Sequence, residues 1–443
     1  MFKSIATASL VLVALTFSDQ IAYNQESYSL DDLVRLTLRE NYQLQIMQKQ
    51  QQIAENMNTP GNAGFLPSVG IESERNWVIQ TSEANLFTGA TRSGENVQST
   101  WFNAFVELDW MIFDGFSMFA RRDRLDHLAS LGETETKYYI EQTISDLAKA
   151  YYSLIREQQL LESYRQSINI SAFRLELEDR KRSVGAGSAL LYHQAVVDFN
   201  ADSSLIMDFE TNIRDLEIQI NRIINRNAKM SLQPMNESID LHGLPVSDEI
   251  IETAFQNNKD LERVRLEEML AEADYRIERG ARYPNVSVFG NYSYTSQSNE
   301  LGIIESARNH GIQFGVRVRF NLYDGGRLNT RLENVLLEQE SVGIMREDTR
   351  SVIESELIRL TTRYDAYMQQ YRLLRQSAEA AERSLIIARE QLQMGAINGF
   401  DFRQTQLASL QVENHLIELL YALKIIEIDI YRISGVLLDK VLT

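Results

Sequence analysis

The sequence predicts a mixed fold of transmembrane β-strands and long α-helices, built as two similar halves. Three observations predict this fold class. The chain repeats its own motifs at a nearly constant spacing, and each half contains an eleven-residue stretch in which apolar and polar residues alternate. Proline, which interrupts helices, occurs only five times and not at all after Pro284, which leaves room for very long helices.

The repeated motifs indicate an internal duplication. Asn41 to Leu44 matches Asn258 to Leu261 at an offset of 217 residues, whereas Asp114-Gly115 matches Asp324-Gly325 at an offset of 210. The seven-residue difference falls inside a β-hairpin. We therefore expect a longer first loop, near residues 82–98, than second loop, near residues 298–308, as is typical of exposed tips.

The alternating stretches predict membrane strands. One face of each stretch is apolar: Phe102, Ala104, Val106, Leu108, Trp110 and Ile112 in the first half, and Ile312, Phe314, Val316, Val318, Phe320 and Leu322 in the second. Eleven residues match a transmembrane strand, whereas soluble strands usually span about 5–6 residues. We expect four strands, near 67–80, 100–113, 284–297 and 310–323. Four strands are too few to enclose a pore, so several chains must share the barrel.

The opposite face and the strand ends carry the candidate channel residues of the barrel. Charges facing lipid are costly, so Glu107, Asp109, Arg317 and Arg319 are predicted to face the lumen and to pair across strands. Aromatic rings near strand ends suit the membrane–water interface. The predicted girdle comprises Trp77, Trp101, Trp110, Tyr292, Phe320 and Tyr323.

Each hairpin is flanked by predicted helices. A helix of about 30 residues precedes it (30–56 and 248–279), and a long helix (116–184 and 327–394) and a return helix (188–225 and 400–434) follow. At 1.5 Å per residue, the long helices reach roughly 100 Å. The second carries a heptad-like seam, which predicts a side-by-side helical partner: Leu357, Leu360, Tyr364, Tyr367, Tyr371, Leu374, Ala378, Ala381, Leu385, Ala388 and Leu392.

An N-terminal segment predicts that the protein is secreted from the cytoplasm, and the composition argues against several classes of function. Lys3 and the apolar run from Ile5 to Phe17 predict a secretory signal over residues 1–22, so the repeats span 23–227 and 248–443, with a linker at 228–247. With 62 acidic against 44 basic residues, we expect no nucleic acid partner. The absence of cysteine and of any catalytic motif predicts no enzyme activity, cofactor or metal site.

The ordered motifs resemble those of the TolC-like outer membrane efflux proteins. The resemblance rests on the Asn-x-x-Leu helix starts, the prolines that open each first strand, Phe113-Asp-Gly115, Tyr323-Asp-Gly-Gly326 and the glycine turns, and it covers about residues 28–435. Tyr42 and Lys259 stand where relatives usually carry proline. The resemblance implies a homotrimer whose twelve strands form one barrel in outer membrane lipid. Its coiled-coil helices continue as an antiparallel tunnel through the periplasm to a periplasmic adaptor (membrane fusion) protein and an inner-membrane transporter.

The resemblance also assigns the far ends of the long helices. It implies a gate at Asp401, with Gln404 in the place of a second acid; alternatively, Asp401 caps the return helix. The first half carries Leu191 at the matching position. The turns imply adaptor-docking tips, formed by Gly185, Ala186, Gly187, Ser188, Gly395, Ala396 and Ile397.

Two other functions fit parts of the pattern. A structural coiled-coil protein of the envelope would account for the helices but does not need membrane-length strands. A passive porin would account for the strands but does not need the long helices. The leading prediction is the exit duct of a tripartite efflux or type I secretion system, whose exported substrate the sequence does not name.

Overall fold

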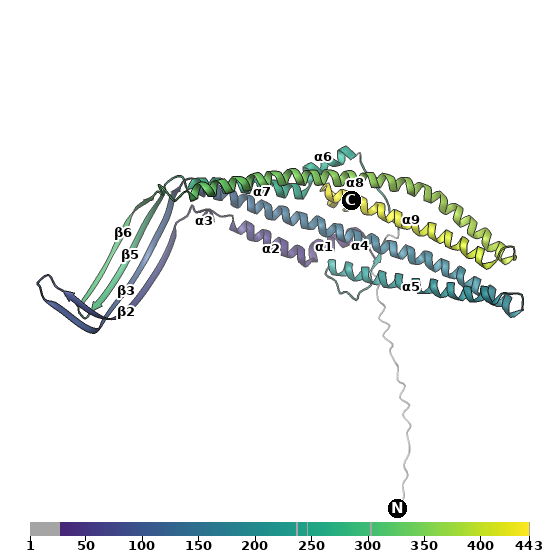
Figure 1. Cartoon of the computed structure of the whole chain (residues 1–443), viewed down its shortest axis with the longest axis horizontal. Helices are drawn as coiled ribbons and strands as arrows, with labels where there is room; N and C mark the ends of the chain where they lie inside the picture. The colour runs from purple at the N-terminus through teal and green to yellow at the C-terminus, as the bar shows by residue number, and fades with distance from the viewer. Residues whose placement is uncertain (1–26, 236–237, 246, 302–303, 443) are drawn as a thin grey trace, which may run out of the picture.

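The computed structural model describes residues 27–442 apart from 236–237, 246 and 302–303, so the predicted signal lies outside the described residues. A four-stranded antiparallel sheet forms one end of the molecule, and two long helical hairpins extend from it to the other end (Figure 1). This arrangement confirms the predicted fold class. Within the described ranges, no helix is both long enough and apolar enough to span a membrane.

The sheet joins the hairpins of both halves. Its strands are β2 (Ser68–Asn85), β3 (Thr91–Asp114), β5 (Asn285–Asn299) and β6 (Ser306–Arg319), in the order β2-β3-β5-β6. Paired residues share a face of the sheet. Val106 pairs with Ile71 and Tyr292, and Tyr292 pairs with Ile312, so one apolar face runs across all four strands. The outer edges of β2 and β6 pair with no described strand.

Three strand predictions are wrong in detail. The first loop is not longer: β2 and β3 continue to Asn85 and Thr91, so the extra residues lengthen the strands and leave a turn of residues 86–90. β6 ends at Arg319 because its partner β5 begins at Asn285, which leaves residues 320–323 unpaired. The ladder shifts between Met111 and Phe113, so Ile112 drops out of register and Phe113 joins the apolar face opposite Val286.

Four long helices lie side by side and extend away from the sheet, toward the right of Figure 1. They are α4 (Ser117–Ser183), α5 (Ala189–Ile223), α8 (Arg327–Gln393) and α9 (Gly399–Ile433). α4 packs against α5 and α9, and α9 packs against α8, which gives the order α5-α4-α9-α8. Every position of the predicted seam on α8 is buried or half-buried, so the heptad pattern did locate the helix partner.

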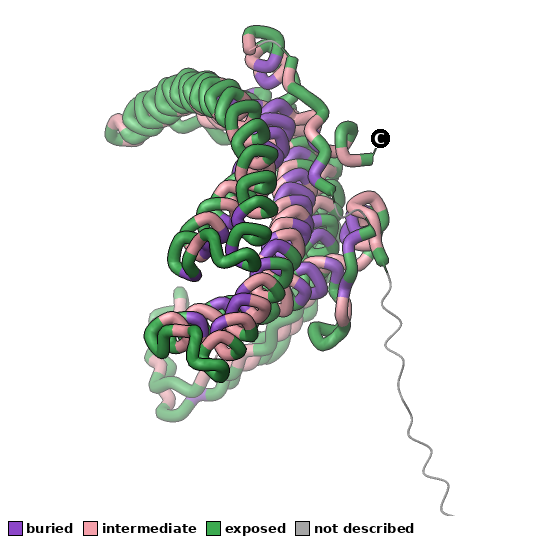
Figure 2. Tube along the Cα trace, turned by 90° about the vertical axis from the view of Figure 1, so that its right-hand side faces the viewer, coloured by how far each residue is buried: buried purple, intermediate pink, exposed green. Residues whose placement is uncertain are grey.

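Shorter helices pack against the long helices between the sheet and the middle of the stack. They are α1 (Leu30–Glu40), α2 (Tyr42–Met57), α3 (Pro60–Ala63), α6 (Ser247–Asn257), α7 (Lys259–Gly280) and α10 (Leu437–Val441). Two short parallel strands, β1 (Ser27–Tyr28) and β4 (Gln233–Pro234), bring the linker against the residues that precede α1. Buried residues concentrate in the middle of the helix stack, with exposed residues around it (Figure 2). The largest apolar core lies where α1, α4, α5, α9, α10 and the linker meet.

The prediction of one unbroken helix before each hairpin is wrong, because an asparagine divides it. The side chain of Asn41 accepts from the Leu44 N–H at 3.0 Å and donates to the Ile223 carbonyl at 2.8 Å. Asn258 repeats both bonds, with Leu261 at 3.0 Å and the Ile433 carbonyl at 2.8 Å. Each asparagine thus starts a new helix and holds the end of the return helix of its own half.

Candidate functional site

The two helical tips have the same backbone design. Each long helix ends in a glycine with a left-handed backbone, Gly185 (φ 76°) and Gly395 (φ 73°). The next residue closes the turn, since the Ala186 N–H donates to the Lys181 carbonyl at 2.9 Å and the Ala396 N–H donates to the Gln391 carbonyl at 2.8 Å. These bonds form the Schellman motif, whose left-handed position favours glycine.

The starts of the return helices differ between the halves. Ser188 occupies the N-cap of α5, but its side chain makes no capping hydrogen bond. Asn398 caps α9 by accepting from the N–H groups of Phe400 at 2.9 Å and Asp401 at 3.0 Å. The alternative prediction that Asp401 is the cap is therefore wrong. Asp401 lies in the first turn, exposed, and its carboxylate accepts from the Asn398 amide at 2.9 Å.

A groove runs between α5 and α9 just behind the tips. It holds about 430 Å³. Its apolar lining residues are Leu190, Val197, Phe400 and Leu407; its polar lining residues are Arg174, His193, Gln194, Asp198, Arg403 and Gln404. Three of the apolar side chains are more than half exposed, Leu190 at 65%, Val197 at 66% and Phe400 at 58%. Among the predicted tip and gate residues, Gln404 alone lines this groove.

A buried ionic network beside this groove ties the two halves together. The Arg403 guanidinium on α9 donates to both carboxylate oxygens of Asp202 on α5, each at 2.8 Å. Ser171 on α4 donates to the same carboxylate at 2.6 Å. Nearby, Arg174 and Asp198 pair at 2.7 Å, and the Arg174 side chain is only 3% exposed. Sequence reasoning missed this network, because its partners lie far apart along the chain.

On the polar face of the sheet, one predicted ion pair forms. Arg317 lies 3.5 Å from Asp109, and both side chains are about half exposed, at 46% and 40%. The Arg317 guanidinium also lies over the Phe289 ring, 4.7 Å from its centre. Glu107 and Arg319 share this face, but neither forms an ion pair with a described residue. The predicted cross-strand pairing is thus half right.

The residues of the predicted aromatic girdle do not all lie on one face of the sheet. Trp77, Trp110 and Tyr292 lie on the apolar face, and the Trp110 indole N–H donates to the Phe65 carbonyl at 2.9 Å. Trp101 pairs with Asn76 and Gln297, which places it on the face of Glu107. The girdle assignment of Trp101 is therefore wrong, because it is an odd number of residues from Trp110. Phe320 and Tyr323 lie beyond the end of β6, exposed.

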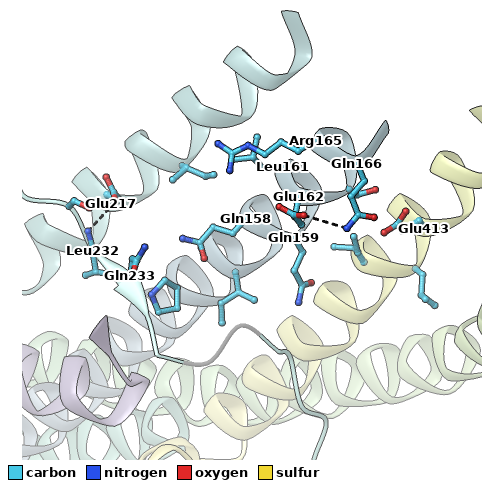
Figure 3. A pocket seen from close by; sticks show the side chains of 17 residues that line it. Gln158, Gln159, Leu161, Glu162, Arg165, Gln166, Glu217, Leu232, Gln233 and Glu413 are labelled. Atoms are coloured by element: carbon cyan, nitrogen blue, oxygen red, sulfur yellow. Dashed lines mark hydrogen bonds between the residues drawn. The ribbon is translucent and has the colours of Figure 1, made fainter. Parts of the chain in front are cut away.

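A second groove, in the middle of the helix stack, has a polar lining and shows no cluster of catalytic side chains. It holds about 780 Å³ between α4, α5, the linker and α9, and amide and charged side chains dominate its lining (Figure 3). Those labelled include Gln158, Gln159, Glu162, Arg165, Gln166 and Glu413. Among the described residues, no group of three or more histidine, aspartate or glutamate side chains could hold a metal ion.

Comparison with known proteins identifies the family. The model of the outer membrane efflux protein family matches residues 33–226 and 250–436, one segment for each half. These two segments cover most of the chain. The chain belongs to the outer membrane efflux protein family. Proteins of this family are transport proteins rather than enzymes, and its channels form trimers and partner with efflux pump components.

Individual relatives agree with this assignment. Outer membrane protein TolC of Vibrio cholerae is 24% identical over 189 residues, a match that spans 41% of this chain and 42% of the relative. The CmeC outer membrane channel of Campylobacter jejuni has a TM-score of 0.79 at 13% identity and covers 99% of this chain and 94% of its own. A membrane protein from Pseudomonas aeruginosa has a TM-score of 0.78 at 17% identity, covering 98% and 96%. At these identities the structural matches establish the fold.

Proposed function

We propose that this efflux protein is the outer membrane exit duct of a tripartite efflux system, in which three copies form one continuous channel. The observation that carries the proposal is the sheet with two unpaired edges. If β6 of one copy pairs with β2 of the next, three four-stranded sheets close into a barrel of twelve strands without free edges. The 67-residue helices α4 and α8 then continue this barrel for roughly 100 Å into the periplasm.

The outer faces of the helix stack support the same assembly. α5 and α8 lie at the two ends of the four-helix order, so among these four helices α5 packs mainly against α4, and α8 against α9. α8 exposes apolar side chains along its length: Leu336, Leu337, Ile344, Val352, Ile358, Leu373, Ile386 and Ile387. In the trimer, α8 of one copy would cover α5 of the next.

The groove between α5 and α9 supports docking of a periplasmic adaptor. Its exposed apolar side chains Leu190, Val197 and Phe400 suit the apolar face of an amphipathic helix. The tip turns at Gly185 and Gly395 lie at the end of this groove, so a helical hairpin of the adaptor would contact groove and turns together. The proposed docking surface thus includes the predicted tips and continues from them along α5 and α9 toward the sheet.

Asp401 is the proposed gate acid. It is exposed and lies in the first turn of α9, and among the described residues its carboxylate accepts a hydrogen bond from the Asn398 side chain alone. Gln404 follows one turn later, also exposed, but it lines the groove between α5 and α9 rather than the proposed ring. Three copies would bring three Asp401 carboxylates around the axis, and such a ring favours cations. The substrate is proposed to be chosen by the inner-membrane transporter, since the duct contributes only width and lining charge.

Conductance of the purified protein in planar bilayers tests this proposal. We expect a trimer by native mass spectrometry and stable channels that prefer cations.

A variant in the groove tests adaptor docking separately. Val197→Glu should leave the conductance unchanged but abolish adaptor binding, because it places a charge in the apolar groove. Asp208→Asn, at an exposed acid on α5, is the matched control. A monomer without channel activity would overturn the proposal and would support the structural coiled-coil alternative.

A further inference from the structure

A cluster of aromatic rings lies at the junction where the strands meet the helices, and we call it the aromatic collar: Phe65, Phe113, Phe116, Phe119 and Tyr283. The Phe116 ring lies 5.1 Å from Phe113, 6.4 Å from Phe119 and 6.2 Å from Tyr283, and Phe65 lies 5.1 Å from Phe119. Phe113 belongs to the apolar face of the sheet. The collar therefore continues the apolar face of the sheet past the end of β3 toward the helices. Unlike an ordinary core cluster it is open, since Phe116 is 59% and Phe119 is 54% exposed.

Phe116 is held in an unfavourable backbone conformation. Its φ of 69° is left-handed, where bulky side chains are rare, and the matching residue of the second half is Gly326 with φ 81°. Glycine would adopt this turn freely. The first half therefore places an exposed aromatic ring where the fold itself needs only glycine. Strain that the fold does not require points to a function for the side chain.

Two arginines near the collar in sequence form no ion pair with any residue that the structure describes. Arg279 lies in the last turn of α7, and Arg282 precedes Tyr283 of the collar; both are exposed, and neither guanidinium contacts a described acid or carbonyl. Five other arginines of the junction pair with carboxylates: Arg121 with Asp114, Arg122 with Asp126, Arg124 with Asp274, Arg276 with Asp123 and Arg331 with Glu278. In a chain of net charge −18, two unpaired arginines beside apolar rings suit an external anion.

We propose that this junction is a binding site for phospholipid of the inner leaflet, in which the collar contacts the acyl chains and Arg279 and Arg282 bind the phosphate. The inference rests on the proposed function, because it takes the apolar face as the lipid-facing side of the barrel. Aromatic rings prefer the membrane–water interface, and arginine binds phosphate with two parallel bonds. The site lies mostly in the first half and in α7, so the trimer would carry three such sites.

Native mass spectrometry of the full-length protein with added dioleoylphosphatidylglycerol tests the arginines. We expect Arg279→Gln/Arg282→Gln to weaken lipid binding about tenfold, from the loss of two charge contacts. The matched control is Arg375→Gln/Arg383→Gln, which removes two exposed arginines of α8 far from the sheet. The control should bind lipid as the wild type does. Equal binding by both double variants would overturn the proposal.

Fluorescence quenching by brominated phospholipids tests the collar independently. In vesicles, Phe116→Trp should gain emission that bromines near the headgroup quench, whereas Phe400→Trp at the tip should gain emission that they do not quench. An unquenched tryptophan at position 116 also overturns the proposal. The channel conductance of the arginine variant separates the two proposals, because a conducting trimer with unaltered lipid binding defeats only the lipid site.

Discussion

Arg403 and Asp202 join the two halves of the chain near the helical tips by a pair of hydrogen bonds, both 2.8 Å long. Their side chains are 12% and 4% exposed. Ser171 donates to the Asp202 carboxylate at 2.6 Å, and Arg403 also donates to the Gln406 side-chain oxygen at 3.1 Å. The Gln406 amide in turn donates to the Ser167 carbonyl of α4 at 2.9 Å. α9 of the second half is thus fixed to α4 and α5 of the first half at one buried point.

Arg403→Gln should loosen the tips. The substitution leaves the Asp202 carboxylate buried without its cation, which typically costs about 3–5 kcal/mol. Hydrogen exchange should show faster exchange of amides in residues 165–205 and 399–410, and unchanged exchange in the sheet. Arg165→Gln is the control, because its pair with Glu210 is 52% exposed on both sides and is expected to contribute less than about 1 kcal/mol. Equal protection in both variants would show that the buried pair does not hold the tips.

Asp401→Asn should reduce the cation preference of the channel. The substitution removes three carboxylates from the proposed gate of the trimer while keeping the shape of the side chain. The amide can keep a hydrogen bond with Asn398, so α9 should begin at the same residue. We expect a lower cation-to-anion permeability ratio and weaker block by divalent cations in planar bilayers. Asp208→Asn should change neither quantity; selectivity that survives at position 401 would move the gate elsewhere.

The sequence predicted the fold class because its strongest signals are local and repeated. Alternation located the apolar face, and the seam of α8 located the side that packs, as the burial of Leu357 and Leu392 shows. Strand ends were mispredicted, because an end depends on where the partner stops: β6 finishes opposite Asn285 whatever its own pattern. The error at Trp101 had another cause. Its place on the polar face could have been predicted from the sequence, because Trp101 is an odd number of residues from Trp110.

The site was less accessible to sequence reasoning than the fold. Arg403 lies in a predicted helix, but its partner Asp202 is 201 residues away, and no local pattern joins them. The cap at Asn258 is local and matches the Asn-x-x-Leu motif, but the bond from Asn258 to the Ile433 carbonyl, 175 residues further on, has no local signal. Phe116 follows an Asp-Gly pair that predicts a turn, but the left-handed backbone of a phenylalanine appears only in the structure. Each of these features depends on a tertiary contact.

Gly280→Ala should destabilise the junction more than an ordinary helical substitution does. A Cβ at Gly280 would lie 1.9 Å from the Ser117 hydroxyl oxygen and 3.1 Å from the Gly115 carbonyl oxygen, so α7 and α4 would have to separate. We expect a loss of at least about 1–3 kcal/mol. Gly343→Ala is the control, since nothing lies within 4 Å of its Cβ on α8, and alanine should stabilise that helix by up to about 1 kcal/mol. Thermal unfolding followed by circular dichroism measures both changes.

Glu141 should make the helical region less stable as the pH rises. Burial raises the pKa of its carboxyl group to about 7, against the opposing charges of Lys259 and Arg432, and Glu262 and Asp439 add to the rise. The unfolded chain releases this proton near its ordinary value of 4.5, so between pH 4.5 and 7 the folded state holds the extra proton. Stability from this group is therefore present below about pH 4.5 and is lost progressively up to about pH 7.

The variant Glu141→Gln removes this titration. Relative to the wild type it should be similar in stability near pH 4.5 and more stable at pH 8, by roughly 1–3 kcal/mol. Hydrogen exchange of the α4 amides around position 141, corrected for the intrinsic effect of pH, measures the difference without requiring the whole trimer to unfold reversibly. Glu133→Gln is the control, because Lys137 lowers the pKa of that more exposed carboxyl group. A pH dependence that is the same in wild type and Glu141→Gln would show that Glu141 stays ionised in the fold.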